Sequence, residues 1–136
     1  MPLPELNYLA ILVSGIVIFI LGGLWYSVLF GRPWMALMGK TEEELKANAA
    51  GPASYAIVFL CGLITAFALA IVIQQFAPVT IERGLMVAAL CWAGFAGVTS
   101  FGTSLFSAQP RMLWLINSGY NLVSFLAAGA ILSAWR

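Results

Sequence analysis

FILGGLWYSVLFGRPWM, residues 19–35, contains the features that decide the fold. Its first half is strongly apolar and includes Gly22 and Gly23, its middle holds the aromatic pair Trp25 and Tyr26, and its last part, GRPWM, is more polar. Aromatic side chains of this kind gather at the headgroup level of a bilayer. We therefore expect an apolar helix that ends at a lipid boundary, followed by a chain that turns along the membrane surface.

The composition of the whole chain agrees with this expectation. Of its 136 residues, 62% are hydrophobic and 8% are charged, whereas a soluble domain carries about 25% charged residues. So few charges cannot cover a water-facing surface, and no basic cluster suggests a nucleic-acid partner. The sequence predicts one integral membrane domain with the lipid bilayer as its solvent. Its place is the cell membrane, which is the inner membrane if the organism is bacterial.

Four segments are long and apolar enough to cross a membrane, which takes about 20 residues for a hydrocarbon core of about 30 Å. They cover about residues 6–29, 53–76, 82–106 and 112–135. The predicted fold class is therefore all-α, a polytopic membrane protein with four transmembrane helices in a single domain, residues 1–136. The last two connections are short, so the second, third and fourth spans are expected to be antiparallel neighbours.

The loop at residues 30–52 is the only long connection, and it carries signals for short interfacial helices. Pro33 can open a helix that Gly39 ends. A capping box beginning at Thr41 then predicts a second helix at about residues 42–49.

Lysine and arginine near the ends of the spans predict the orientation. Four of them lie on the side of the long loop and two on the side of the termini. This bias places the long loop in the cytoplasm and both termini outside. The first group is Arg32, Lys40, Lys46 and Arg111, and the second is Arg83 and Arg136.

The chain has few side chains that could serve in catalysis, metal binding or proton transfer. It has no His and no Asp, and its glutamates lie at span ends or in the long loop. Acid–base catalysis, metal ligation and proton relay need such groups in a cleft or within the membrane. Cys61 and Cys91 both lie in apolar runs and suit packing. We therefore expect no enzyme activity, no catalytic residue, no metal site and no cofactor.

The polar residues of the last two spans form a candidate cluster, in which stripes on the two helices are expected to face each other or a common cavity. Two interpretations stay open: hydrogen bonds that hold the bundle together, or a lining for an uncharged or weakly polar solute. The second would make the protein an oligomeric channel or transporter. The cluster consists of Thr99, Thr103, Asn117, Asn121 and Ser124.

Small residues lie on one face of each of the first two spans. Such faces let helix backbones approach closely in lipid, and they offer more surface than one small bundle needs. They predict a homo-oligomer or an accessory subunit of a larger membrane complex, which works without catalysis. The residues are Gly15, Gly22, Gly62, Ala66 and Ala70.

Aromatic and basic side chains near the span ends are expected to anchor the chain at the membrane interface. Trp25, Tyr26 and Trp34 would lie at headgroup level. Arg32 and Arg111 would extend to the headgroups or bind a lipid phosphate there.

Several motifs together resemble a known family. They are Leu6-Asn7-Tyr8-Leu9, Gly22 with Trp25-Tyr26-Ser27, Phe30-Gly31-Arg32-Pro33-Trp34-Met35, Asn117-Ser118-Gly119-Tyr120, Gly129-Ala130 and Trp135-Arg136. On these residues the chain is similar to domain-of-unknown-function family 1761, small four-span membrane proteins of bacteria and fungi. The resemblance covers essentially the whole chain and implies the four-span architecture. It implies no activity and no site residue.

Overall fold

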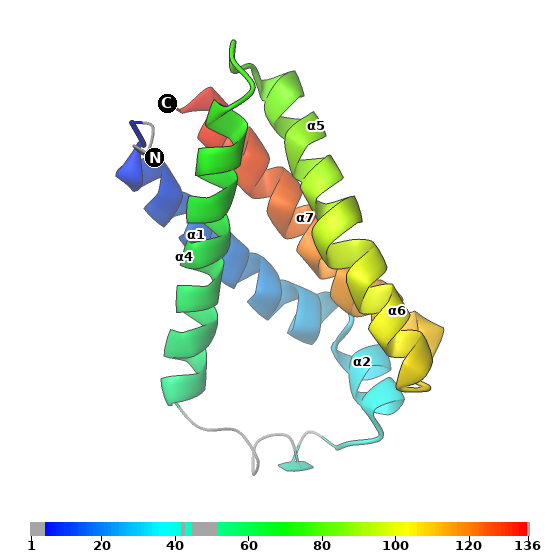
Figure 1. Ribbon diagram of the computed structural model, residues 1–136. Coiled ribbons are helices and arrows are strands. Elements are labelled where there is room, and N and C mark those ends of the chain that lie inside the picture. The colour runs from blue at the N-terminus through cyan, green and yellow to red at the C-terminus, as the bar shows by residue number, and fades with distance from the viewer. Residues whose placement is uncertain (1–4, 42, 45–51, 136) are drawn as a thin grey trace.

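The computed structural model describes residues 5–41, 43–44 and 52–135 of the chain (Figure 1). Helices and their connections make up this part, with no strand in it. Four helices are long and apolar enough to cross a membrane, and they cover Tyr8–Leu29, Ala53–Gln74, Ile81–Phe106 and Arg111–Ala134. The all-α, four-span fold class is confirmed.

The first span has two parts. Helix α1 covers Tyr8–Leu24, and the side chain of Asn7 caps it by accepting the backbone N–H of Ala10 at 3.1 Å. A π-helical segment, η1, continues it over Trp25–Leu29. The backbone N–H of Phe30 closes this segment by donating to the carbonyl of Trp25, five residues back, at 2.8 Å.

A short helix follows the first span, as the sequence predicts. Helix α2 covers Gly31–Met38, so it begins two residues before the expected Pro33. It ends at Gly39, whose φ of 70° is the left-handed conformation that glycine adopts without strain. The hydroxyl of Thr41 then accepts the backbone N–H of Glu44 at 3.1 Å, as a capping residue does. The second helix expected at about residues 42–49 lies largely outside the described residues.

The other three spans follow in antiparallel order. Helix α4 covers Pro52–Gln74. The third span consists of α5 (Ile81–Cys91), the π-helical segment η2 (Trp92–Gly97) and α6 (Val98–Phe106), and the fourth is α7 (Arg111–Ala134).

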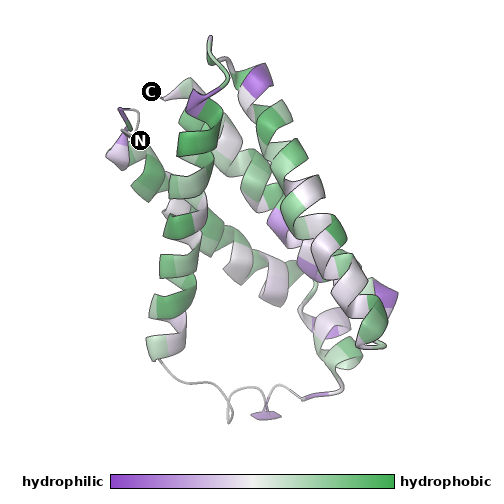
Figure 2. Cartoon of the chain, viewed as in Figure 1, coloured by the Kyte–Doolittle hydropathy of each residue, from purple (hydrophilic) through white to green (hydrophobic). Residues whose placement is uncertain are grey.

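Both ends of the described chain lie at one end of the bundle, together with the connection between α4 and α5 (Figure 1). There the side-chain amide of Asn7 donates to the carbonyl of Trp135 at 3.4 Å. At the opposite end α4 diverges from α2, α6 and α7. Apolar residues cover most of the helix surfaces, and hydrophilic ones gather at helix ends and on part of α7 (Figure 2). This pattern is the one that a lipid solvent requires.

Close helix contacts depend on glycine at the end of the bundle that holds the termini. A Cβ atom at Gly84 of α5 would lie 2.5 Å from the Cβ of Ser133 and 3.0 Å from the carbonyl oxygen of Gly129, both on α7. A Cβ at Gly15 of α1 would lie 2.5 Å from a methyl carbon of Leu63 on α4. A larger residue at Gly84 would require the two helices to move apart, whereas one at Gly15 would require the Leu63 side chain to shift.

The small-residue faces that the sequence singles out are used inside the bundle. Gly15, Gly62, Ala66 and Ala70 are buried, and Gly62 lies against Ile18. Gly22 lies against the ring of Tyr120. These faces join the chain's own helices, so they do not supply a surface for a partner.

Candidate functional site

Three of the five residues of the predicted polar cluster meet at one hollow. Thr103 of α6 lines it together with Asn117 and Asn121 of α7. The hollow has a volume of about 280 Å³ and also contains Ser100, Ser104, Gln109, Trp114 and Ser118. We call it the polar hollow. It lies in the half of the third and fourth spans next to their connection, residues 107–110.

The other two residues of the cluster lie elsewhere. Thr99 is exposed, and its hydroxyl donates to the carbonyls of its own helix turn at Phe95, 3.0 Å, and Ala96, 3.3 Å. Ser124 is buried, and its hydroxyl has no hydrogen-bond partner within the described part of the chain. Neither Thr99 nor Ser124 lines the polar hollow that the described residues form.

A larger depression lies on the other side of Asn117. It has a volume of about 800 Å³ and is bounded by α1, η1, α2, α4 and α7. Five aromatic rings and one amide characterise its wall, and we call it the aromatic groove. These side chains are Phe19, Tyr26, Trp34, Tyr55, Tyr120 and Asn117.

A hydrogen bond joins Tyr26 of the aromatic groove to Asn117, which lines both spaces. The hydroxyl of Tyr26 donates to the Oδ1 atom of Asn117 at 2.7 Å. The Tyr26 ring also packs edge-on against Trp34 and Tyr120, with ring centroids 5.2 and 5.5 Å apart. Tyr120 in turn donates its hydroxyl to the carbonyl of Ile18 at 3.0 Å. This network joins α1, η1, α2 and α7.

Two tryptophans hold α7 between the first and third spans. The indole N–H of Trp25, the first residue of η1, donates to the carbonyl of Ile116 at 2.8 Å. That of Trp92, the first residue of η2, donates to the carbonyl of Ser118 at 3.0 Å. A Cβ at Gly119 would lie 3.1 Å from the Trp25 ring, so the glycine makes room for it. We call the two indoles the tryptophan clamp.

These contacts change the roles expected for the interface anchors. Trp25 and Tyr26 direct their polar atoms to α7, whereas the sequence pattern suggests side chains that turn to lipid headgroups. Trp34 is half-buried against Tyr26. Arg32 and Arg111 are exposed at the end of the bundle opposite the termini, where lipid headgroups would be in reach.

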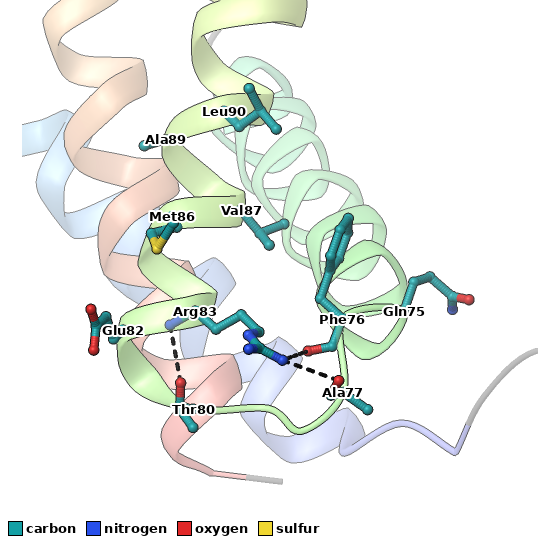
Figure 3. A pocket seen from close by; sticks show the side chains of 10 residues that line it. All are labelled: Gln75, Phe76, Ala77, Thr80, Glu82, Arg83, Met86, Val87, Ala89 and Leu90. Atoms are coloured by element: carbon teal, nitrogen blue, oxygen red, sulfur yellow. Dashed lines mark hydrogen bonds between the residues drawn. The ribbon is translucent and has the colours of Figure 1, made fainter.

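A third depression, of about 970 Å³, is lined by residues of α5 and of the connection that precedes it (Figure 3). Its one arginine, Arg83, donates from Nη1 to the carbonyls of Phe76, Ala77 and Pro78 at 3.4, 3.1 and 3.4 Å. The hydroxyl of Thr80 accepts the backbone N–H of Arg83 at 3.1 Å and so caps the third span. The guanidinium thus satisfies carbonyls of the connection between α4 and α5, a structural role.

The aromatic groove was not accessible to sequence reasoning as a site. Phe19, Tyr26, Trp34, Tyr55 and Tyr120 come from five separate elements, and no spacing relates them. The nearest signal is Tyr120, which lies three residues after Asn117 and so shares one side of α7 with it. In the described residues no group of three His, Cys, Asp or Glu side chains could hold a metal ion.

Comparison with known proteins bears on the whole chain. No curated protein and no solved structure matches it. The match that does exist confirms the family resemblance of the chain. The sequence model of the family described as proteins of unknown function, DUF1761, matches residues 9–133, and the chain belongs to that family.

Proposed function

We propose that this membrane protein is non-catalytic and acts by assembling with a further transmembrane helix, from a second copy of itself or from a larger membrane complex. The observation that supports this is an unused pair of glycines on the third span. A Cβ built at Gly94 or at Gly102 meets no atom within 4 Å. These positions are eight residues apart and lie on a span whose outer face exposes Phe95 to 80% and Val98 to 64%.

The contrast with the glycines that lie at helix contacts supports the proposal. Gly15, Gly84 and Gly129 each face a neighbouring helix at contact distance. Glycine lowers the stability of a helix by about 1 kcal/mol relative to Ala, and in lipid it is favoured where another backbone approaches. Gly94 and Gly102 have no such neighbour within the described chain. A helix from outside the chain would provide one.

Disulfide crosslinking in native membranes tests this proposal. Cys61 and Cys91 are first replaced by Ala, and single cysteines are then introduced by Gly94→Cys or Gly102→Cys. We expect oxidation to give a dimer or a heavier adduct. The matched control is Ile64→Cys on α4, which is also exposed (59%) but lies away from this face. Adducts from Ile64→Cys as abundant as those from the glycine positions, or none from any position, would refute the proposal.

The polar hollow supports a second candidate function, a route for a small uncharged or weakly polar solute. Thr103, Asn117 and Asn121 surround it with hydroxyl and amide groups that could replace the hydration of such a solute. The test is glycerol uptake into proteoliposomes. Transport would be lost in the double variant Asn117→Leu, Asn121→Leu and kept in Thr99→Val, which changes a residue outside the hollow. Uptake no faster than in protein-free liposomes would leave assembly as the function.

A further inference from the structure

The aromatic groove contains hydrogen-bond donors that the protein does not use. Trp25, Trp92 and Trp114 each donate their indole N–H to a protein oxygen. The indole N–H of Trp34, on the groove wall, finds no acceptor among the described residues. The amide of Asn117 accepts from Tyr26 through Oδ1, and its N–H groups likewise have no acceptor in the described chain.

Unpaired donors at the edge of a bilayer take their partners from water, from lipid or from a ligand, because the hydrocarbon cannot supply an acceptor. A donor is satisfied by an acceptor oxygen, such as a carbonyl. The groove therefore favours a ligand whose head presents acceptor oxygens to Trp34 and Asn117.

The charge of the groove restricts that head further. Its described lining residues carry no charged side chain. The nearby basic residues Arg32 and Lys40 are exposed and do not belong to the lining. A phosphate or carboxylate in the groove would lose its hydration without gaining a counter-charge from the described lining residues. These residues therefore favour a neutral head.

The rest of the wall suits an apolar body that enters from the bilayer. Phe19 packs edge-on against Tyr55 at 6.5 Å and against Phe59 at 5.9 Å between ring centroids. Tyr55 and Val58 of α4 are 66% and 53% exposed, so this side of the groove is open to the surroundings of the bundle. The volume of about 800 Å³ is in the range of small-molecule sites, about 300–1,000 Å³.

The position of the groove along the first span selects among neutral lipids. It lies where that span ends and α2 begins, which is the level of the aromatic belt. The ester carbonyls of glycerolipids lie at this level of a bilayer. We propose that the aromatic groove binds an uncharged glycerolipid, a diacylglycerol in chemical class, with its ester carbonyls accepting hydrogen bonds from Trp34 and Asn117 and its acyl chains leaving between α1 and α4. This proposal concerns a different surface from the one around Gly94 and Gly102 that we propose for assembly.

Photocrosslinking tests the proposal on the full chain in phosphatidylcholine nanodiscs. The probe is a diacylglycerol with a diazirine in one acyl chain, and labelled peptides are mapped by mass spectrometry. We expect labels on α1 and the first half of α4, around Phe19 and Tyr55. Unlabelled dioleoylglycerol should compete. Dialkylglycerol, which lacks the carbonyls, should compete about fivefold to tenfold less well, the effect of about one lost hydrogen bond.

Two variants test the donors. Trp34→Phe and Asn117→Leu should each weaken labelling by about fivefold. The matched control is Trp114→Phe, since that indole already donates to Ser100 at 2.9 Å and lies outside the groove. Because Asn117→Leu also removes the partner of Tyr26, Trp34→Phe is the decisive variant, with its fold checked by circular dichroism.

Three results would overturn the proposal. Equal competition by dioleoylphosphatidic acid would show that ordinary boundary lipids fill the groove. Equal competition by dialkylglycerol would show that apolar filling alone is recognised. Equal labelling of Trp34→Phe and the unchanged protein would show that the indole donor has no role.

Discussion

The contact between α5 and α7 predicts that Gly84→Ala destabilises the bundle. The new Cβ would lie 2.5 Å from the Cβ of Ser133 and 3.0 Å from the carbonyl oxygen of Gly129. Carbon atoms in contact prefer about 3.5–4.0 Å, so the two helices would have to separate by about 1 Å. A backbone carbonyl cannot rotate away as a long side chain can. Overpacking of this kind costs about 1–3 kcal/mol.

The same change also has a favourable part, because Ala is a better helix former than Gly by about 1 kcal/mol. Gly102→Ala measures that part alone, since a Cβ at Gly102 meets no atom within 4 Å. Both residues lie on the third span. The difference in unfolding free energy between the two variants therefore isolates the overpacking cost, and we expect Gly84→Ala to be less stable by about 1–3 kcal/mol.

Unfolding by a denaturing detergent, added to the protein in mild-detergent micelles and followed by tryptophan fluorescence, provides the measurement. The double variant Gly84→Ala, Ser133→Gly removes the closest atom and should recover part of the loss. If Gly84→Ala is as stable as Gly102→Ala, α5 and α7 do not pack at the distance described, and the reasoning fails.

Three further predictions concern other contacts. Tyr26→Phe removes the donor to Asn117 and should cost about 0.6 kcal/mol in the same unfolding assay, the average for hydrogen bonds in membranes; a double-mutant cycle with Asn117→Leu that shows no coupling would contradict this. Thr80→Ala removes the cap of the third span and should cost about 1 kcal/mol, and an unchanged unfolding midpoint would count against the cap. In a background without the native cysteines, Trp135→Cys should react with an impermeant maleimide on intact cells, and Lys40→Cys only after the membrane is opened, as the positive-inside rule predicts; the reverse pattern would invert the orientation.

The number and approximate limits of the helices are readable from the sequence, because hydropathy over about 20 residues depends on composition alone. The observed spans begin and end within a few residues of the expected ones. Local capping signals are equally readable: Thr41 and Gly39 act where the sequence places them. Such features depend on neighbours in the chain and need no knowledge of the fold.

The sequence predicts much less well which residues each helix face contacts. The glycine face at Gly15 suggests a free packing surface until Leu63 of α4 is found against it. Trp25 and Tyr26 have the composition of an interface belt, yet their polar atoms bind α7. The π-helical segments are a main reason. Each shifts the helical register by one residue, so a 3.6-residue projection of the sequence misplaces the residues that follow it.

The segment η2 determines how the two parts of the third span, α5 and α6, are rotated relative to each other. A π-helical turn contains one residue more than a regular α-helix needs over the same stretch, here within Trp92–Gly97. If the segment became regular α-helix with all its residues kept, everything beyond it would rotate by about 100° relative to everything before it. Trp92 and Thr103 could then no longer both face the last span. The one surplus residue of η2 thus sets the angle about the helix axis between the indole of Trp92 and the hydroxyl of Thr103. Any motion that converted η2 to regular α-helix would turn one of these two side chains away from α7.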